Sequence, residues 1–334
     1  MRSSEAPSMR SIAIRTVLFL TPVAAAWCLL EWWMTYVPDS HSVKRENLLN
    51  VAPEIDTLVL GSSSAFWDIA PRELEGRTYN LANVSQTLYY DDQLLSQVLS
   101  EAPRLKRVIL TINYVSFFFD MHGSDEETRQ YYYWQRWRIR PSHFGDVFDP
   151  RMYSAVVLRT PGFAASSLKQ AALDYLRKGS FEAPRPDVTI LADGWSPQSA
   201  AKLPDLRPSV LDKKIAFHHR LMKEANVELN LAALRHMIDT LEARGIELIL
   251  VTPPVYEGYA ARMNHEYWRR TQEIVADIVR NHSSVRYYSF LQTPGLGMEN
   301  FLDEDHLNER GAERFSRLLN QDIRGERQAA TPRE

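Results

Sequence analysis

Short apolar runs alternate with amphipathic stretches over most of the chain. Apolar residues recur at helical spacing between the runs, as in Leu231, Leu234, Ile238 and Leu241. Strands that alternate with helices form βαβ units, so the pattern predicts an α/β domain with three layers, α/β/α, around a mostly parallel sheet. Four runs have the length and composition of buried strands and a fifth is shorter: residues 56–61, 106–113, 245–251, 285–290 and 79–82.

The N-terminal segment has a different pattern. Residues 12–36 are mostly apolar and about long enough to span a bilayer as a helix. Arg2, Arg10 and Arg15 precede its apolar run from Val17 to Leu30. Because this basic flank lies on the N-terminal side only, it predicts a cytoplasmic N-terminus and a body on the periplasmic side of a bacterial inner membrane. Two alternatives are a signal peptide cleaved after residues 24–26 and a buried helix of a cytosolic protein.

Changes in these patterns divide the chain into segments. The stretch before the first strand is polar, which indicates a linker, and a long aromatic and proline-containing stretch interrupts the alternation of strands and helices. We expect the interruption to be a large mixed insertion that binds substrate or a partner. The predicted segments are a cytoplasmic stub and transmembrane anchor at 1–37, a linker at 38–53, a catalytic sheet domain at 54–113 and 226–322, the insertion at 114–225, and a disordered tail at 323–334.

Composition and charge exclude several classes of function. The chain has 334 residues and a formal net charge of −3, so it has no broad basic field to attract nucleic acid. Its one cysteine, Cys28, cannot form an intrachain disulfide or a thiolate metal cluster. His218 and His219 are adjacent and have no matching carboxylate pattern, so we expect surface or packing histidines, no metal and no cofactor.

A serine follows the first predicted strand directly. The strand ends in Gly61-Ser62-Ser63, and the carboxyl ends of strands in open α/β sheets are where ligands bind. Ser63 is therefore well placed to be a nucleophile, provided that a base activates its hydroxyl. Taken alone, the same residues fit a strand-to-helix turn in which serine caps the helix.

A histidine and an aspartate follow the last predicted strand and precede a helix that Asn308 can cap. Asp303 lies three residues before His306, so its carboxylate can hold the imidazole in one orientation. Because both predicted strands end at one edge of the sheet, we expect Ser63, His306 and Asp303 to form a catalytic triad.

These elements together resemble the SGNH (GDSL-like) hydrolases and acyltransferases. The resemblance rests on Gly61-Ser62-Ser63, on Asn80-Leu81-Ala82-Asn83 and on the run from Asp303 through His306 to Ala312, and it covers the predicted sheet domain without the insertion. It implies an SGNH-like fold and assigns Ser63, His306 and Asp303 as the triad.

The resemblance also implies an oxyanion hole. Its donors would be the backbone N–H groups of Ser63 and Ala82 and the side-chain amide of Asn113. Two positions depart from the family pattern: Ala82 stands where the family has glycine, and Asn113 is retained in a block that has lost its glycine and aspartate.

Within this family the layout is similar to the membrane-anchored proteins of alginate O-acetylation and teichoic-acid D-alanylation. The resemblance implies an O-acetyltransferase or esterase acting on a cell-envelope or secreted glycan, with a multi-spanning membrane acyltransferase as partner. A lipase or esterase for small esters and a non-catalytic glycan-binding or scaffold protein of an envelope complex are the alternatives.

An aromatic and basic run lies inside the predicted insertion. Tyr131, Trp134 and Trp137 offer faces on which a sugar could stack, and Arg138 could pair with its carboxylate. We expect these four residues to bind substrate, with a membrane or partner contact and the core of the insertion as alternatives.

Overall fold

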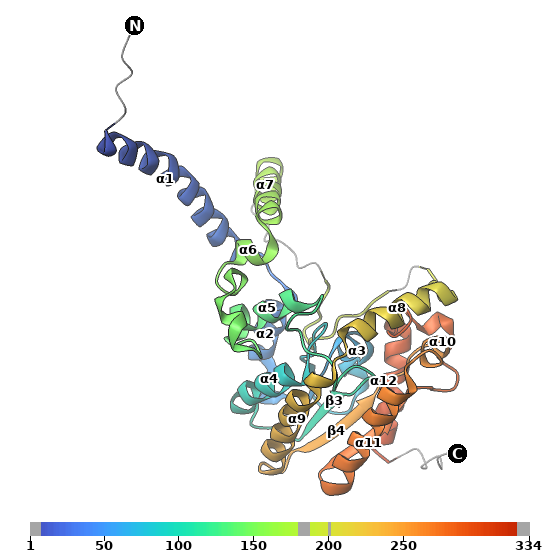
Figure 1. Ribbon diagram of the computed structural model, residues 1–334. Coiled ribbons are helices and arrows are strands. Elements are labelled where there is room, and N and C mark those ends of the chain that lie inside the picture. Colours follow the sequence, from blue (N-terminus) through green and yellow to red (C-terminus); the bar gives the residue numbers. More distant parts are fainter. Residues whose placement is uncertain (1–7, 180–187, 200–201, 326–334) are drawn as a thin grey trace. The chain divides into compact units, whose positions relative to one another are not determined.

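The computed structural model describes residues 8–179, 188–199 and 202–325 (Figure 1). The chain forms two compact units. The anchor unit comprises Met1–Asp39 and Val147–Pro186, and the sheet unit comprises Ser40–Asp146 and Asp187–Glu334.

Five parallel strands form the centre of the sheet unit, in the order β2-β1-β3-β4-β5. They match the five runs of the sequence to within a few residues, and the parallel sheet confirms the predicted fold class. The strands are β1 Thr57–Leu60, β2 Thr78–Asn80, β3 Arg107–Thr111, β4 Glu247–Thr252 and β5 Val285–Ser289.

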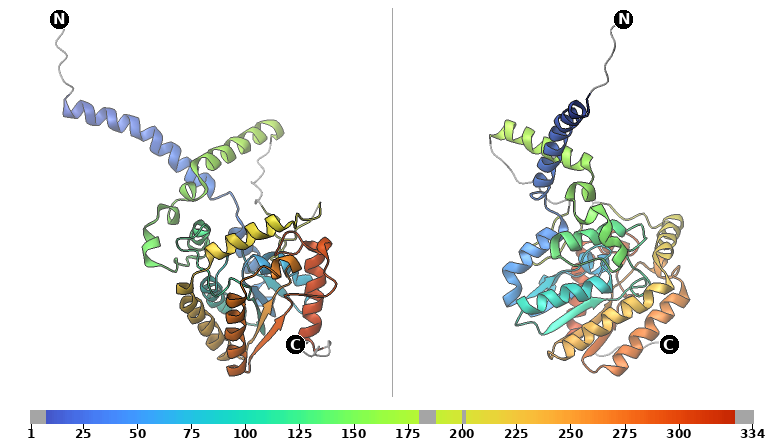
Figure 2. Two further views of the ribbon diagram at one scale, coloured as in Figure 1. Left: turned by 45° about the vertical axis from the view of Figure 1, so that its right-hand side comes forward. Right: turned by 60° about the vertical axis from the view of Figure 1, so that its left-hand side comes forward.

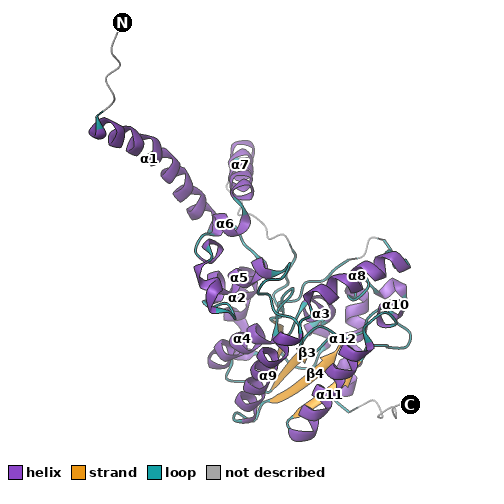
Figure 3. Ribbon diagram, viewed as in Figure 1, coloured by secondary structure: helices purple, strands orange, loops and turns teal. Residues whose placement is uncertain are grey.

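Helices cover both faces of this sheet, which gives three layers (Figure 3). Side chains alternate along each strand, so Leu58 and Leu60 pack into one core and Val59 into the other. Helices α4 (Leu88–Glu101), α9 (Val227–Glu242) and α11 (His265–Asn281) contribute to the first core. Helices α3 (Ser63–Asp68) and α12 (Glu309–Ile323) contribute to the second.

Shorter elements complete the sheet unit. Its other helices are α2 Ser40–Val51, α5 Gln130–Trp137, α8 Pro208–Leu221 and α10 Glu257–Ala260. The 3-10 turns of the described chain are η1 Ala52–Glu54, η2 Pro71–Glu73, η3 Glu127–Arg129, η4 Phe144–Phe148, η5 Pro150–Met152, η6 Glu224–Asn226 and η7 Met298–Asn300.

The segment predicted to be a linker, 38–53, is instead mostly the helix α2. Its buried face consists of His41, Lys44 and Leu48, so two of its three buried side chains are polar and the sequence resembles a solvated segment. The Lys44 side-chain nitrogen donates to the carbonyl oxygens of Asn80, at 3.0 Å, and Ala82. These bonds fasten α2 to the end of β2.

The anchor unit contains α1 (Met9–Met34), α6 (Ala155–Arg159) and α7 (Pro161–Lys178). By length and composition, α1 is sufficient to cross a membrane. Glu31 near its end accepts from the Ser154 hydroxyl and, at 3.0 Å, from the Ala155 N–H at the start of α6. The predicted insertion 114–225 is therefore divided, because its middle part belongs with α1 and its two ends belong to the sheet unit.

The last helix agrees with the sequence. The Asn308 side chain caps α12 by accepting from the Gly311 N–H at 3.0 Å, as predicted. The helix continues to Ile323, one residue into the predicted tail, and residues 326–334 of that tail lie outside the described residues.

Candidate active site

Gly61 makes the turn that carries the serine. Its φ of 124° is strained for other residues, and a Cβ there would lie 2.1 Å from Thr111 Oγ1. Its N–H donates to Asp91 Oδ1 at 2.8 Å, and this hydrogen bond holds the turn in place. Ser62 then occupies the cap position of α3 and Ser63 is the first residue of that helix.

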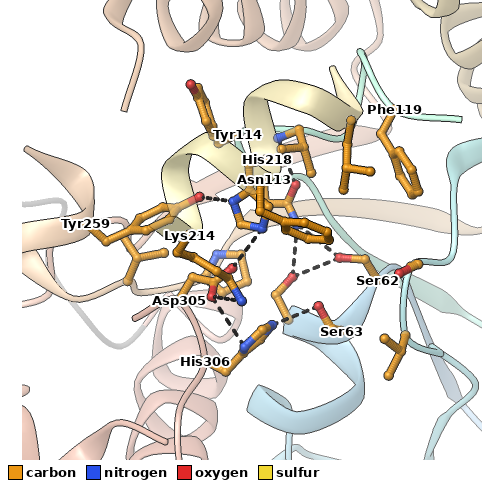
Figure 4. A pocket seen from close by; sticks show the side chains of 18 of the residues that line it. Ser62, Ser63, Asn113, Tyr114, Phe119, Lys214, His218, Tyr259, Asp305 and His306 are labelled. Carbon is orange, nitrogen blue, oxygen red and sulfur yellow. Dashed lines mark hydrogen bonds and ion pairs between the residues drawn. The ribbon is translucent and has the colours of Figure 1, made fainter. Parts of the chain in front are cut away.

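Ser63, His306 and Asp303 meet as the sequence predicts, and Figure 4 shows the contact between Ser63 and His306. Ser63 Oγ lies 2.8 Å from His306 Nε2. On the other side of the ring, His306 Nδ1 lies 2.8 and 2.9 Å from the two carboxylate oxygens of Asp303. Trp67 packs edge-on against the imidazole with ring centroids 4.5 Å apart. A hydroxyl, an imidazole and a carboxylate in this order form the geometry of a serine nucleophile with its base.

A second carboxylate lies beside the triad. Asp305 Oδ1 is 3.4 Å from His306 Nδ1 and 2.9 Å from the Lys214 ammonium. Asp305 Oδ2 is 3.6 Å from His218 Nε2, and His218 Nδ1 bonds to the Tyr259 hydroxyl at 2.6 Å. Lys214 and His218 are four residues apart on α8, so one helix face directs both toward Asp305 (Figure 4).

These charges set the protonation of the site. Burial alone would lower the pKa of His306, but Asp305 and Asp303 outweigh it and raise the pKa to about 9. Burial would raise the pKa of Asp303, but the facing His306 lowers it. Burial lowers the pKa of His218 to about 4, so this imidazole is neutral at pH 7. Burial acts to lower the pKa of Lys214, whereas Asp305 and Asp303 raise it and keep the ammonium charged.

Asn113 directs its amide N–H group at the serine turn. Its side-chain oxygen accepts from the Val115 N–H at 3.1 Å and the Ser116 hydroxyl at 3.0 Å. The amide nitrogen therefore faces the other way and donates to Ser62 Oγ at 3.0 Å. Asn113 and Ser63 line the same cavity, and the Asn113 amide N–H group points at the turn that carries Ser63, where it bonds to the neighbouring Ser62 hydroxyl.

Ala82 does not occupy the predicted donor position. It is fully buried, and its N–H donates to Asn80 Oδ1 at 3.1 Å, so the N–H is already used within the fold. Ser85, three residues later, lines the cavity of Ser63 instead. Its φ is 60°, the left-handed region that glycine favours, and its N–H has no acceptor among the backbone hydrogen bonds of the described chain.

The four residues of the aromatic run are not in this cavity. Tyr131 and Trp137 are buried on α5, and Trp134 is half-buried with the guanidinium of Arg138 lying 5.6 Å from its ring. Aromatic side chains with this much apolar area stabilise a core, and here they pack the sheet unit. The aromatic residues that line the cavity are Trp67, Tyr114, Phe119, Phe217 and Tyr259.

Lys214, His218, Asp305 and Ser85 line the cavity but were not predicted from the sequence. His218 was expected to be a surface or packing residue, yet it lines the cavity and is 8% exposed. The signal was the four-residue spacing of Lys214 and His218 on an amphipathic helix. That spacing places both on one face but does not say where the face points.

Two groups of side chains in the described part of the chain have the spacing of metal ligands. They are Asp303, Asp305 and His306, and His122, Glu127 and Asp146. In the first group Lys214 pairs with Asp305 at 2.9 Å, and in the second His122 Nδ1 lies 2.8 Å from Asp146 Oδ2.

No protein-family model matches the sequence, and no curated protein matches it. The chain is similar to a solved structure described as a candidate platelet activating factor from Streptococcus pneumonia. The two share 12% identity and a TM-score of 0.40, over 90% of this chain and 99% of that one. A likeness of this size does not bear on function.

Proposed function

We propose that the protein is a serine-dependent acyltransferase or esterase of the SGNH type. The observation that carries the proposal is the 2.8 Å contact between Ser63 Oγ and His306 Nε2, with Asp303 on the far side of the imidazole. A base within hydrogen-bond reach of a serine, itself oriented by a carboxylate, is the arrangement that activates serine for attack.

The reaction has two halves. Neutral His306 takes the Ser63 proton while Ser63 Oγ attacks the ester carbonyl, and the amide of Asn113 stabilises the oxyanion. His306 then protonates the departing alcohol oxygen, and the acyl group stays on Ser63. A water molecule or a sugar hydroxyl next gives its proton to His306 and attacks the acyl carbon, which restores Ser63. Asp303 holds the imidazole and stabilises its charged form throughout.

The acceptor proposed here is a hydroxyl group of a cell-envelope or secreted glycan, and the acyl group is acetyl. This part rests on the sequence resemblance to glycan O-acetylation proteins. A multi-spanning membrane acyltransferase is the proposed source of the acyl group.

A specific observation also favours a second function, an esterase for short apolar acyl chains. Beside the triad, the cavity wall includes Val115, Phe119, Phe217, Leu221 and Met263. Apolar side chains of this kind bind acyl carbon atoms. Rates on p-nitrophenyl esters from two to eight carbon atoms distinguish the two functions, because an acetyl-specific enzyme loses rate with length and the second function predicts a gain.

The site of action proposed is the periplasmic side of the inner membrane. The helix α1 would cross the membrane once, with the arginines at its start in the cytoplasm.

Hydrolysis of p-nitrophenyl acetate by the full chain in detergent tests the catalytic proposal. Ser63→Ala should reduce the rate by at least about 10³-fold, and should abolish labelling by a fluorophosphonate. Ser62→Ala is the matched control and should keep the label, because His306 bonds to Ser63. A chain that hydrolyses the ester equally well without the Ser63 hydroxyl would refute the triad.

A further inference from the structure

The anchor unit exposes large apolar side chains at high density. Outside α1, five residues of this unit are mostly exposed to solvent. Their exposed fractions are 51% for Tyr36, 74% for Phe148, 66% for Tyr153, 53% for Tyr175 and 79% for Leu176. Among the described residues, the much larger sheet unit exposes fewer such side chains. Exposed apolar surface that gathers in one region marks a contact site.

Helix α7 packs on the last turns of α1. Trp33 Nε1 donates to Ser167 Oγ at 3.2 Å, and Ala164 is buried in a small core with Trp33 and Met34. The two helices also line an apolar groove formed by Trp32, Trp33, Tyr36, Leu168, Ala171, Ala172 and Tyr175. In Figure 2, the end of α1 and the start of α7 lie close together, and the two helices point away from each other beyond that point.

The apolar stripe of α7 is wider than its contact with α1. Ala164 and Leu168 face α1, while Ala165, Ala172 and Leu176 continue the stripe on exposed surface. At 100° per residue these three lie within about 40° of one another. Gln170 lies about 120° away from Leu176 on the polar side of the helix.

The dimensions of α1 place α7 at the surface of a membrane. Residues 12–30 of α1 are exposed or nearly so and would span about 28 Å, close to the thickness of the hydrocarbon core, with Arg15 near the cytoplasmic end, where its long side chain reaches the interface. Glu31 is already bonded to α6, so the protein part of the anchor unit begins where the lipid core would end. Trp32 and Tyr36 lie at that level, where such side chains prefer the interface.

We propose that α7 is an interfacial helix that rests on the leaflet next to the anchor unit. Its stripe of Ala165, Ala172 and Leu176 would enter the boundary between headgroups and acyl chains, with Arg177 and Lys178 at the headgroups. Lipid is the occupant because the stripe is continuous, through Trp32 and Tyr36, with the apolar surface of α1. This inference rests on the proposed membrane crossing of α1 and is independent of the triad.

Depth-dependent fluorescence quenching tests the proposal on the full chain. Single-cysteine chains are made by combining Cys28→Ser with either Leu176→Cys or Gln170→Cys, labelled with a polarity-sensitive dye and reconstituted in phosphatidylcholine and phosphatidylglycerol vesicles. Quenching by lipids that carry a nitroxide near the headgroup should be at least roughly threefold stronger at position 176 than at position 170. The side chain of Leu176 is 79% exposed, so its replacement removes little packing.

Labelling the native Cys28 distinguishes failure of the interfacial helix from failure of the membrane crossing, because Cys28 is exposed and lies within α1. Strong quenching at Cys28 with equal, weak quenching at positions 176 and 170 would overturn the interfacial helix. The surface would then be open to a partner protein. An unquenched Cys28 would overturn the crossing of α1 together with the inference. Neither outcome changes the result expected from the ester hydrolysis assay, which tests the triad of Ser63 separately.

Discussion

His306 has two carboxylates within reach of one nitrogen atom, and they differ in what else holds them. Asp303 is bonded to Nδ1 through both oxygens, at 2.8 and 2.9 Å, and also accepts from the His306 N–H at 2.9 Å. Asp305 lies farther away, at 3.4 Å, and forms its closer ion pair with Lys214 at 2.9 Å. The geometry therefore favours Asp303 over Asp305 as the carboxylate of the proposed triad.

Exchange of each carboxylate for an amide tests this assignment. Asp303→Asn should lower kcat on p-nitrophenyl acetate by about 10³- to 10⁴-fold, because the amide stabilises the wrong imidazole tautomer. Asp305→Asn is the matched variant. It should lower kcat by less than about tenfold at the optimum pH of the variant, since the hydrogen bond between Asp303 and His306 remains. If the two losses were reversed, Asp305 would be the triad acid.

The pH dependence of the reaction follows from the raised pKa of His306. The imidazole acts as a base only when neutral, and its pKa in the resting site is about 9. We therefore expect kcat/KM to rise with pH and to reach its plateau only near or above that value. A plateau already reached at pH 6 would contradict the charge arrangement described here. Asp305→Asn removes one of the charges that raise the pKa and should move the rise to lower pH.

Lys214 should shift the pKa of His306 in the opposite direction to Asp305. The groups that face His306 include Asp303, Asp305 and the buried Asp68, all of which raise its pKa. The ammonium of Lys214, 2.9 Å from Asp305, offsets part of this negative charge. Lys214→Met should therefore raise the pKa of His306 further and move the rise in kcat/KM to higher pH.

The neighbouring residue supplies the control for Lys214. Lys213→Met removes the same charge from the exposed side of α8 and should leave the midpoint of the kcat/KM profile unchanged. A Lys214→Met profile with a lower plateau and an unmoved midpoint would show that the ammonium supports the fold only and does not tune the base.

At the scale of elements, the turn between β1 and α3 depends on Gly61. Gly61→Ala should lower the free energy of unfolding by roughly 3 kcal/mol or more, because a strained φ of 124° is combined with a Cβ placed 2.1 Å from Thr111 Oγ1. Chemical denaturation measures this loss. Gly123→Ala is the matched control: its φ is 61°, but nothing lies within 4 Å of the added carbon, so only about 1 kcal/mol should be lost.

The strands were predictable because their side chains alternate between two apolar cores. Every residue of β1 is buried, which gives the continuous apolar run that buried parallel strands show. The helix α2 was not predictable in the same way. Its key buried residue, Lys44, is a lysine whose side-chain nitrogen donates to carbonyl oxygens far along the chain. A local pattern contains no information about such distant acceptors.

The site was predictable to the extent that short motifs determine it. Ser63 follows β1 closely, and Asp303 and His306 lie in the loop between β5 and α12, which the fold brings to the same edge of the sheet. Ser85 was missed because its left-handed φ of 60° is a property of the folded loop, and a serine in the sequence does not indicate such a φ. Lys214 and His218 come from α8, within the segment where no strand order was available to place them.

At the scale of the whole molecule, the anchor unit is built from two segments that the sheet unit separates in the chain. The middle part of the predicted insertion returns to α1, and the contact between Glu31 and α6 joins them. Consequently the end of α1 is fixed to protein directly, without a flexible stalk. An orientation of α1 in the membrane therefore fixes the side on which the anchor unit lies.

The arginine flank predicts that orientation. Arg10 and Arg15 lie at the start of α1, and a C-terminal alkaline phosphatase fusion to the full chain should therefore be active in bacteria, since this reporter matures only outside the cytoplasm. A C-terminal fusion to a fluorescent protein that matures only in the cytoplasm is the matched control and should stay dark. A bright fusion combined with an inactive phosphatase would place Ser63 in the cytoplasm, where neither envelope glycans nor an exported acyl group could reach it.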